Sequence, residues 1–114
     1  PLKQTLEEVE EEYRKGMILK VSDADNTIIG SVRAYFANGT VYIGKLIVHP
    51  QKQRQGIGTK LLLAVEAEYL GQRYELFTST RSARNIALYQ RLGYRIFAQK
   101  KITDEMEFVY LEKY

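Results

Sequence analysis

The chain has 114 residues, a formal net charge of +3 and no cysteine. That length corresponds to one domain, residues 1–114, with a core large enough to need no cross-links. The lack of cysteine excludes disulfides, thiolate metal sites and a cysteine nucleophile, and the single histidine, His49, excludes histidine clusters, so we expect no metal. The longest apolar run, Leu61–Val65, is too short to span a bilayer, and no signal segment is recognisable, so a cytoplasmic domain is expected.

The first segment is predicted to be a helix. Thr5 followed by Glu8 forms a capping-box pattern, which predicts Thr5 as the N-cap, and Gly16 is expected to end the helix. The apolar residues of this segment recur at helical spacing: Leu2, Leu6, Val9 and Tyr13.

Three antiparallel strands are predicted next, over Met17–Ser22, Thr27–Phe36 and Thr40–Val48. The polar cluster Asp23–Asn26 predicts the first turn, and Asn38-Gly39 predicts a tight hairpin. Alternation along the third strand predicts two faces, one with Val41, Ile43, Lys45 and Ile47 and the other with Tyr42, Gly44, Leu46 and Val48.

The second half alternates helices and strands. A helix is expected over Gly56–Leu70, a strand over Tyr74–Thr80, a helix over Ala83–Leu92, and a terminal hairpin formed by Tyr94–Lys100 and Met106–Glu112. The unit from Val41 to Thr80 predicts a right-handed crossover between parallel strands. The fold class is therefore α/β, with a mixed, mostly antiparallel sheet, a central strand–helix–strand crossover and flanking helices.

The segment from Val48 to Lys60 is the most informative. A strand ends, a polar loop follows, and a helix begins with Gly56 and Gly58, so unpaired helix N–H groups and glycine backbone are open to a ligand. Basic side chains nearby suit a diphosphate, namely Lys52, Arg54 and Lys60. The pattern matches neither common nucleotide loop, because Lys60 does not follow a glycine and Leu61 stands where a third glycine would be.

Residues 26–65 and 76–103 contain no acid, which favours a local anionic ligand over an extended nucleic-acid surface, although solvated basic faces are equally compatible.

Two blocks resemble the GNAT superfamily of N-acetyltransferases. Gln53-x-x-Gly56-x-Gly58 after a strand resembles its acetyl-CoA signature. Residues 85–94, with Asn85, Tyr89 and the closing pair Gly93-Tyr94, look like its second block, one helix and one strand further on. The resemblance runs from about the first helix to the end of the chain, and it implies acetyl transfer from acetyl-CoA to an amine. The family fold normally opens with a further strand and helix, so the domain is expected to be N-terminally incomplete.

The resemblance also implies roles for individual residues. Backbone N–H groups would hold the pyrophosphate: Gln53, Arg54, Gln55, Gly56, Ile57, Gly58 and Thr59. Val48 would pair with the pantetheine arm, and the Leu46 N–H would polarise the thioester carbonyl. Asn85 would contact the pantetheine arm, and the Tyr89 hydroxyl would face the sulfur, first as a hydrogen-bond donor. Capping by Asn85 and simple packing by Tyr89 stay open as structural alternatives.

The general base is missing from the pattern. Many family members carry a glutamate on the strand before the loop, where this chain offers Tyr42, Gly44 and Leu46; His49, a water chain or a carboxylate elsewhere stays open. Without cysteine, direct attack of the amine on the thioester in a ternary complex is favoured over an acetyl-enzyme intermediate.

The expected partners are acetyl-CoA and an amine acceptor, without nucleic acid or membrane, and a homodimer is left open. The alternatives are a noncatalytic acyl-CoA-binding module and a small basic RNA-binding domain, which lacks an RRM or KH signature.

Overall fold

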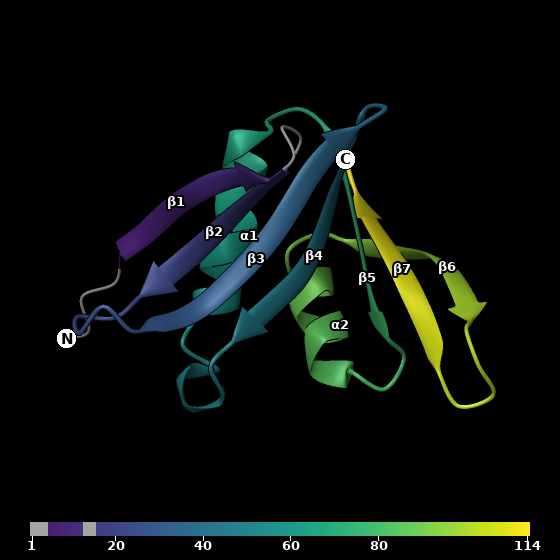
Figure 1. Ribbon diagram of the computed structural model, residues 1–114. Helices are drawn as coiled ribbons and strands as arrows, with labels where there is room; N and C mark the ends of the chain where they lie inside the picture. Colours follow the sequence, from purple (N-terminus) through teal and green to yellow (C-terminus); the bar gives the residue numbers. More distant parts are fainter. Residues whose placement is uncertain (1–4, 13–15) are drawn as a thin grey trace.

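The computed structural model describes the backbone of residues 5–12 and 16–114 and the side chains of residues 16–114. Within these residues, seven strands form one sheet in the order β1-β2-β3-β4-β5-β7-β6 (Figure 1). The strands are β1 (Thr5–Glu12), β2 (Gly16–Ser22), β3 (Ile28–Ala37), β4 (Thr40–Val48), β5 (Arg73–Ser79), β6 (Arg95–Lys101) and β7 (Glu107–Lys113). The helices are α1 (Ile57–Glu68), α2 (Ala83–Arg91) and the 3₁₀ turn η1 (Pro50–Lys52).

The expected turns are confirmed. The Asp23 carboxylate accepts hydrogen bonds from the backbone N–H groups of Asp25 (2.8 Å) and Thr27 (3.1 Å), which closes the β2–β3 turn. Asn38 and Gly39 have φ angles of 53° and 81°, as a type I′ hairpin requires. From β2 to β7 each predicted element is present, with its ends within about two residues of the prediction.

The predicted first helix is wrong. Thr5–Glu12 forms β1, which pairs antiparallel with β2, and Gly16 opens β2 instead of ending a helix. Leu2 and Tyr13, which contributed half of the helical pattern, lie outside the described residues. Pairing with the available edge of β2 supplies a ladder of backbone hydrogen bonds, and this tertiary gain outweighs a weak local helix preference.

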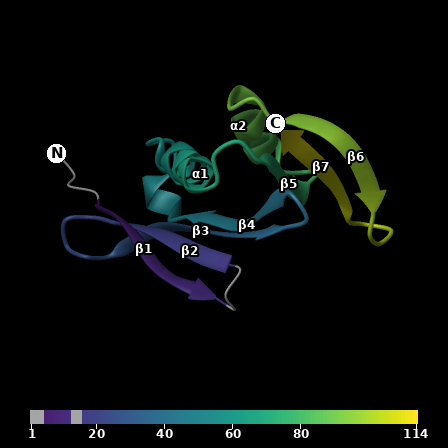
Figure 2. The same ribbon diagram turned by 90° about the horizontal axis from the view of Figure 1, so that it is seen from above.

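Both α-helices cover the same face of the sheet, as the view from above shows (Figure 2). The core lies between them and the sheet, where α1 contributes four buried residues: Ile57, Leu61, Leu62 and Val65. Val32, Val41 and Leu111 are fully buried on the facing strands. The opposite face has no helix over it in the described part of the chain, and large side chains such as Tyr35 and Phe77 are about half exposed there.

The parallel crossover is confirmed, and it leaves the sheet open on one side of its midpoint. β4 and β5 pair through only three residue pairs: Thr40↔Arg73, Val41↔Tyr74 and Tyr42↔Glu75. Beyond these pairs the two strands diverge, as Figure 1 shows. The backbone edge of β4 from Ile43 onward is therefore unpaired on the β5 side. β7 inserts between β5 and β6 and holds β5 along its whole length.

A β-bulge in β4 corrects the predicted faces of that strand. Gly44 pairs with Arg33 and Ile47 with Ser31, so two residues of β4, Lys45 and Leu46, oppose a single residue of β3. Lys45 has a φ of 53°. After the bulge the alternation is inverted, because one extra residue turns every later side chain over.

The side-chain environments of β4 show this inversion of its two faces. Leu46 and Val48 pack against the core on the helix side, whereas Ile47 is 60% exposed on the other face. Tyr42 and Gly44 stay on the open face, so the sequence-based grouping of Leu46 and Val48 with them is wrong. The bulge thus gives β4 access to both sides of the sheet at the opening.

Candidate functional site

The loop between β4 and α1 is held by its own backbone and side chains. His49 caps η1, since its Nδ1 accepts a hydrogen bond from the Gln51 N–H at 3.2 Å. Arg54 and Gly56 have φ angles of 69° and 80°, and Gly56 is the N-cap of α1. His49 is thus an exposed capping residue in the loop.

The N-terminus of α1 is open to a ligand. No side chain caps the helix, and an added Cβ at Gly56 would meet nothing within 4 Å. The first-turn N–H groups therefore lack a side-chain acceptor, and alternating left-handed residues in the preceding loop form the kind of backbone concavity that binds anions.

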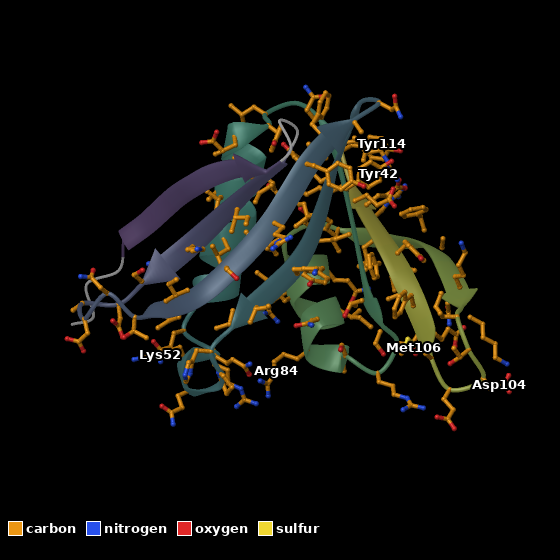
Figure 3. The ribbon with its side chains drawn as sticks, in the orientation of Figure 1. Tyr42, Lys52, Arg84, Asp104, Met106 and Tyr114 are labelled. Carbon is orange, nitrogen blue, oxygen red and sulfur yellow. The ribbon has the colours of Figure 1, made fainter. Side chains whose placement is uncertain are left out.

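The Gln53 side chain contacts both the end of β4 and the start of α2. Its Nε2 donates to the carbonyl oxygen of Val48 at 3.2 Å, and its Oε1 accepts from Arg84 Nη1 at 2.6 Å. The side chain thus connects the end of β4 with the first turn of α2. In Figure 3 Arg84 and Lys52 lie at the same end of the molecule, beside this loop.

A cleft of about 600 Å³ opens between β4, α1 and α2. It brings together nine of the predicted residues, namely Leu46, Val48, Gln53, Arg54, Gly56, Ile57, Gly58, Thr59 and Asn85. Gln55 and Tyr89 do not line it. Four lining residues were missed by the sequence reasoning: Ile47, Arg84, Leu88 and Arg91. The available signal for the two arginines was their seven-residue spacing on one helix in a segment without acids.

Tyr89 lies in the hydrophobic core. It is 5% exposed, and its ring lies 6.2 Å from that of Tyr94. Burial raises the pKa of its phenol to about 12. Its hydroxyl makes no hydrogen bond within the described residues, yet no fully buried side-chain oxygen or nitrogen there lacks a partner. The hydroxyl oxygen is therefore not completely enclosed by the described residues.

A second cavity of about 540 Å³ lies on the opposite face of the sheet. Aromatic rings dominate its wall: Tyr35 stacks on Tyr42 with ring centroids 5.2 Å apart, and Phe77 lies 5.5 Å from Tyr110. Among its described lining residues, Glu75 is the only carboxylate.

Glu75 belongs to a cluster that joins three strands at the end of the sheet where Figure 3 labels Tyr42 and Tyr114. Arg73 donates to Glu75 at 2.9 Å, to Glu112 at 2.8 Å and to the Thr40 hydroxyl at 3.2 Å. The cluster spans β4, β5 and β7 at the place where β4 and β5 are still paired. It therefore fixes the closed end of the opening between them.

A match to a protein-family model assigns the chain to a family of acyltransferases. The sequence model described as "Acetyltransferase (GNAT) domain" matches residues 9–96. The chain therefore belongs to the GNAT acetyltransferase family, and the resemblance noted in the sequence is confirmed. A search of curated protein sequences gave no match.

Solved structures of similar fold agree with this assignment. An IAA acetyltransferase from Bacillus cereus superimposes with a TM-score of 0.82 at 21% identity, covering 97% of this chain and 99% of that one. The ribosomal-protein-S18-alanine N-acetyltransferase from Escherichia coli gives a TM-score of 0.86 at 15% identity, covering 97% and 93%. A GNAT family acetyltransferase from Elizabethkingia anophelis with acetyl-CoA bound gives 0.78 at 20% identity, covering 96% and 97%. At these identities the likeness establishes the fold.

The described residues contain neither a membrane-spanning helix nor a group of metal ligands. No helix there is long and apolar enough to cross a membrane. In the same part of the chain, no three His, Asp or Glu side chains are grouped as a metal site would need.

Proposed function

We propose that the protein is an N-acetyltransferase that transfers the acetyl group of acetyl-CoA to a primary amine by direct attack in a ternary complex. The observation that carries this proposal is that two cavities on opposite faces of the sheet are lined by adjoining segments of β4. Leu46–Val48 line the cleft, and Tyr42–Lys45 line the aromatic cavity. The two meet at the bulge beside the unpaired edge of β4. A donor and an acceptor entering from opposite faces would face each other there, and such alignment supplies much of the rate.

The cleft fits the donor. The pyrophosphate of acetyl-CoA would lie on the backbone N–H groups from Gln53 to Thr59, at the uncapped end of α1. The pantetheine arm would run along Val48 into the opening, beside the unpaired edge of β4, with Asn85 of α2 across the cleft.

The bulge would supply the group that stabilises the tetrahedral intermediate. Lys45 and Leu46 are out of register with β3, so their backbone is free of the regular ladder. The Leu46 N–H directed at the thioester carbonyl would act as a single oxyanion donor, and one such donor is typically worth about 100-fold or more in rate.

Tyr89 would assist the leaving thiolate. With its pKa near 12 and a thiol near 8.5, complete proton transfer from phenol to thiolate is uphill by about 5 kcal/mol. The hydroxyl therefore acts as a hydrogen-bond donor while the C–S bond breaks. In the overall reaction, an N–C bond forms, the thioester C–S bond breaks, and the neutral amine's proton ends on the thiol of CoA.

The acceptor would occupy the aromatic cavity. An amine that enters as an ammonium ion must first lose one proton to the medium. Glu75 is the described carboxylate at that cavity, so we assign it, through water, as the first acceptor of this proton. Its ion pair with Arg73 keeps the carboxylate in a fixed position.

A noncatalytic acyl-CoA-binding protein is the second candidate. The observations that favour it are the absence of a carboxylate on β4 and the deep burial of Tyr89. Such a protein would bind acetyl-CoA in the same cleft without turnover.

A panel of primary amines with acetyl-CoA, read by release of free thiol, tests the proposal. We expect amine-dependent thiol release and a rise in melting temperature with CoA. A melting-temperature rise without thiol release for any amine would favour the binding protein. Stabilisation by oligonucleotides and not by CoA would point instead to the RNA-binding alternative.

A further inference from the structure

The aromatic cavity carries a charge pattern that a simple amine does not explain. Its described lining residues include two cations, Arg33 and Lys45, and one carboxylate, Glu75. That carboxylate is already paired with Arg73 at 2.9 Å. An acceptor that carried only an ammonium group would therefore meet more positive than negative charge in the wall of the cavity, and like charges repel.

Lys45 lies where the aromatic cavity meets the bulge of β4. It is exposed, and it directly precedes Leu46, whose backbone N–H is the proposed oxyanion donor. In the part of the chain that the structure describes, no carboxylate forms an ion pair with Lys45. Its ammonium group is thus available to an acidic group that lies close to the reacting amine.

The other walls of this cavity are aromatic, and one of them is hollow. Tyr35 and Tyr42 stack with ring centroids 5.2 Å apart on β3 and β4, and Phe77 and Tyr110 lie 5.5 Å apart on β5 and β7. Gly44 lines the same cavity, and a Cβ added there would meet nothing within 4 Å. The cavity therefore has space for a planar ring that contacts aromatic side chains from both sides.

The dimensions of the cavity suit a single small molecule with all three groups. Tyr42 and Lys45 are three residues apart on β4, which is about 10 Å along an extended strand. A ring near Tyr42 and an acidic group near Lys45 can therefore belong to one compact ligand. The volume of about 540 Å³ also leaves room for ordered water, at about 30 Å³ for each molecule, between the amine and Glu75.

We propose that the acceptor is an aromatic α-amino acid, whose ring packs over Gly44 between the two aromatic pairs and whose carboxylate pairs with Lys45. This inference rests on the proposed function, because it names the acceptor of that reaction. In an α-amino acid the amine and the carboxylate share one carbon, so a carboxylate held by Lys45 brings the amine to the bulge. The carboxylate also offsets the repulsion between the cationic wall and the ammonium form of the acceptor.

Both contacts have a measurable effect on affinity. Burial of the ring should make L-phenylalanine bind about tenfold or more tightly than L-alanine. The ion pair with the exposed Lys45 is screened by water, so L-phenylalanine should bind about fivefold more tightly than phenethylamine, which lacks only the carboxylate. The second ratio should fall as the salt concentration rises.

Calorimetric titration of these three compounds into the protein saturated with CoA tests the assignment of Lys45. CoA carries no acetyl group, so binding is measured without turnover. In Lys45→Gln the ratio of L-phenylalanine to phenethylamine affinity should fall from about five to near one, and Lys45→Arg should retain it. The matched control is Lys100→Gln, an exposed lysine on β6 outside the cleft and the aromatic cavity, which should leave the ratio unchanged.

Gly44→Leu tests the position of the ring. The added side chain would occupy the hollow, so L-phenylalanine and phenethylamine should both lose about tenfold or more in affinity. The affinity for CoA should stay as in the wild type, because Gly44 does not line the cleft. An unchanged CoA affinity also shows that this variant is folded.

The outcomes separate this inference from the proposed function. Equal affinity for L-phenylalanine and phenethylamine in the wild type, or an unchanged ratio in Lys45→Gln, would overturn the acidic acceptor. Wild-type affinity for L-phenylalanine in Gly44→Leu would overturn the position of the ring. In each case, release of thiol with other amines would leave the acetyltransferase proposal standing. Binding of CoA without thiol release from acetyl-CoA for any amine would overturn the proposed function and this inference together.

Discussion

Gly58 and Leu88 bring the two helices together at the floor of the cleft. An ideal Cβ at position 58 would lie 3.2 Å from Leu88 Cδ2 and 3.7 Å from Leu46 Cδ2. The absence of a side chain at this position therefore allows α1 to approach α2 and β4 at once. Gly58, in the first turn of α1, thus has a packing role, whereas Gly56 has a conformational one, with a φ of 80° and nothing within 4 Å of an added Cβ.

Gly58→Val should destabilise the protein. The added methyl groups must displace Leu88 or Leu46, and overpacking of this kind typically costs about 1–3 kcal/mol. Urea unfolding measures the change. Gly44→Ala is the control, because a Cβ there meets nothing within 4 Å and the expected change is under about 1 kcal/mol. Equal stability of Gly58→Val and the wild type would show that the helices separate easily.

Gly56→Asp should lower the affinity for acetyl-CoA by about tenfold or more, since a carboxylate would lie where the diphosphate is expected. Gly56→Asn is the matched control, because both residues tolerate a positive φ and differ mainly in charge. We expect similar melting temperatures for the two variants and a clear difference in calorimetric affinity. The same affinity in both would remove the diphosphate from this loop.

Tyr89→Phe should lower kcat by about ten- to a thousandfold with little change in KM for acetyl-CoA, because it removes only the donor to the leaving thiolate. Steady-state kinetics and urea unfolding together measure the effect. Stability should be nearly unchanged, since the hydroxyl makes no hydrogen bond to the described residues. Wild-type kcat in this variant would assign protonation of CoA to another donor or to solvent.

Stability should fall in alkaline solution because buried phenols resist ionisation. Burial raises the pKa values of Tyr74, Tyr89 and Tyr94, and for Tyr94 the carboxylate of Glu66 adds to the rise. Above a pH of about 10 the unfolded chain loses these protons while the folded chain retains them, so the stabilisation is complete below pH 10 and is lost as the pH rises.

For Tyr89 alone the loss between pH 10 and 12 is about 3 kcal/mol. Urea midpoints at pH 8, 10 and 11 measure this decline. Tyr89→Phe should flatten it, whereas Tyr35→Phe, which changes an exposed ring, should leave it as in the wild type. An identical decline in both variants would contradict the assignment to Tyr89.

Glu66→Gln should destabilise the packing of α1 against the end of the sheet. The Glu66 carboxylate accepts from the Tyr94 hydroxyl at 2.8 Å and from Lys113 Nζ at 3.0 Å, and its side chain is 13% exposed. Loss of the charge at this partly buried site should cost about 1–3 kcal/mol. Glu68→Gln on the same helix is the exposed control, and equal urea midpoints for the two variants would show that the pair contributes little.

The local elements from β2 onward follow from the sequence because their signals are local. Asn38-Gly39 specifies a hairpin through its backbone preferences, and the α1 pattern of Ile57, Leu61, Leu62 and Val65 repeats at the helical period. The loop with Gly56 and Gly58 could be singled out for the same reason, since its two glycines and the strand before it are contiguous in the chain. The helix predicted at the start failed because pairing with β2, a tertiary interaction, decided that segment.

The opening between the strands was decided by the tertiary structure alone. Alternation assumes a regular strand, and the bulge at Lys45 and Leu46 reverses the faces that follow it. Gly44 inside the strand is compatible with a bulge but does not fix its position. Arg84 meets Gln53, and Glu75 reaches the aromatic cavity, only after β5 and α2 have folded back on β4. The sequence by itself thus determined the elements from β2 onward and the glycine-containing loop before α1, whose causes are local, while long-range packing decided which side chains meet around that loop.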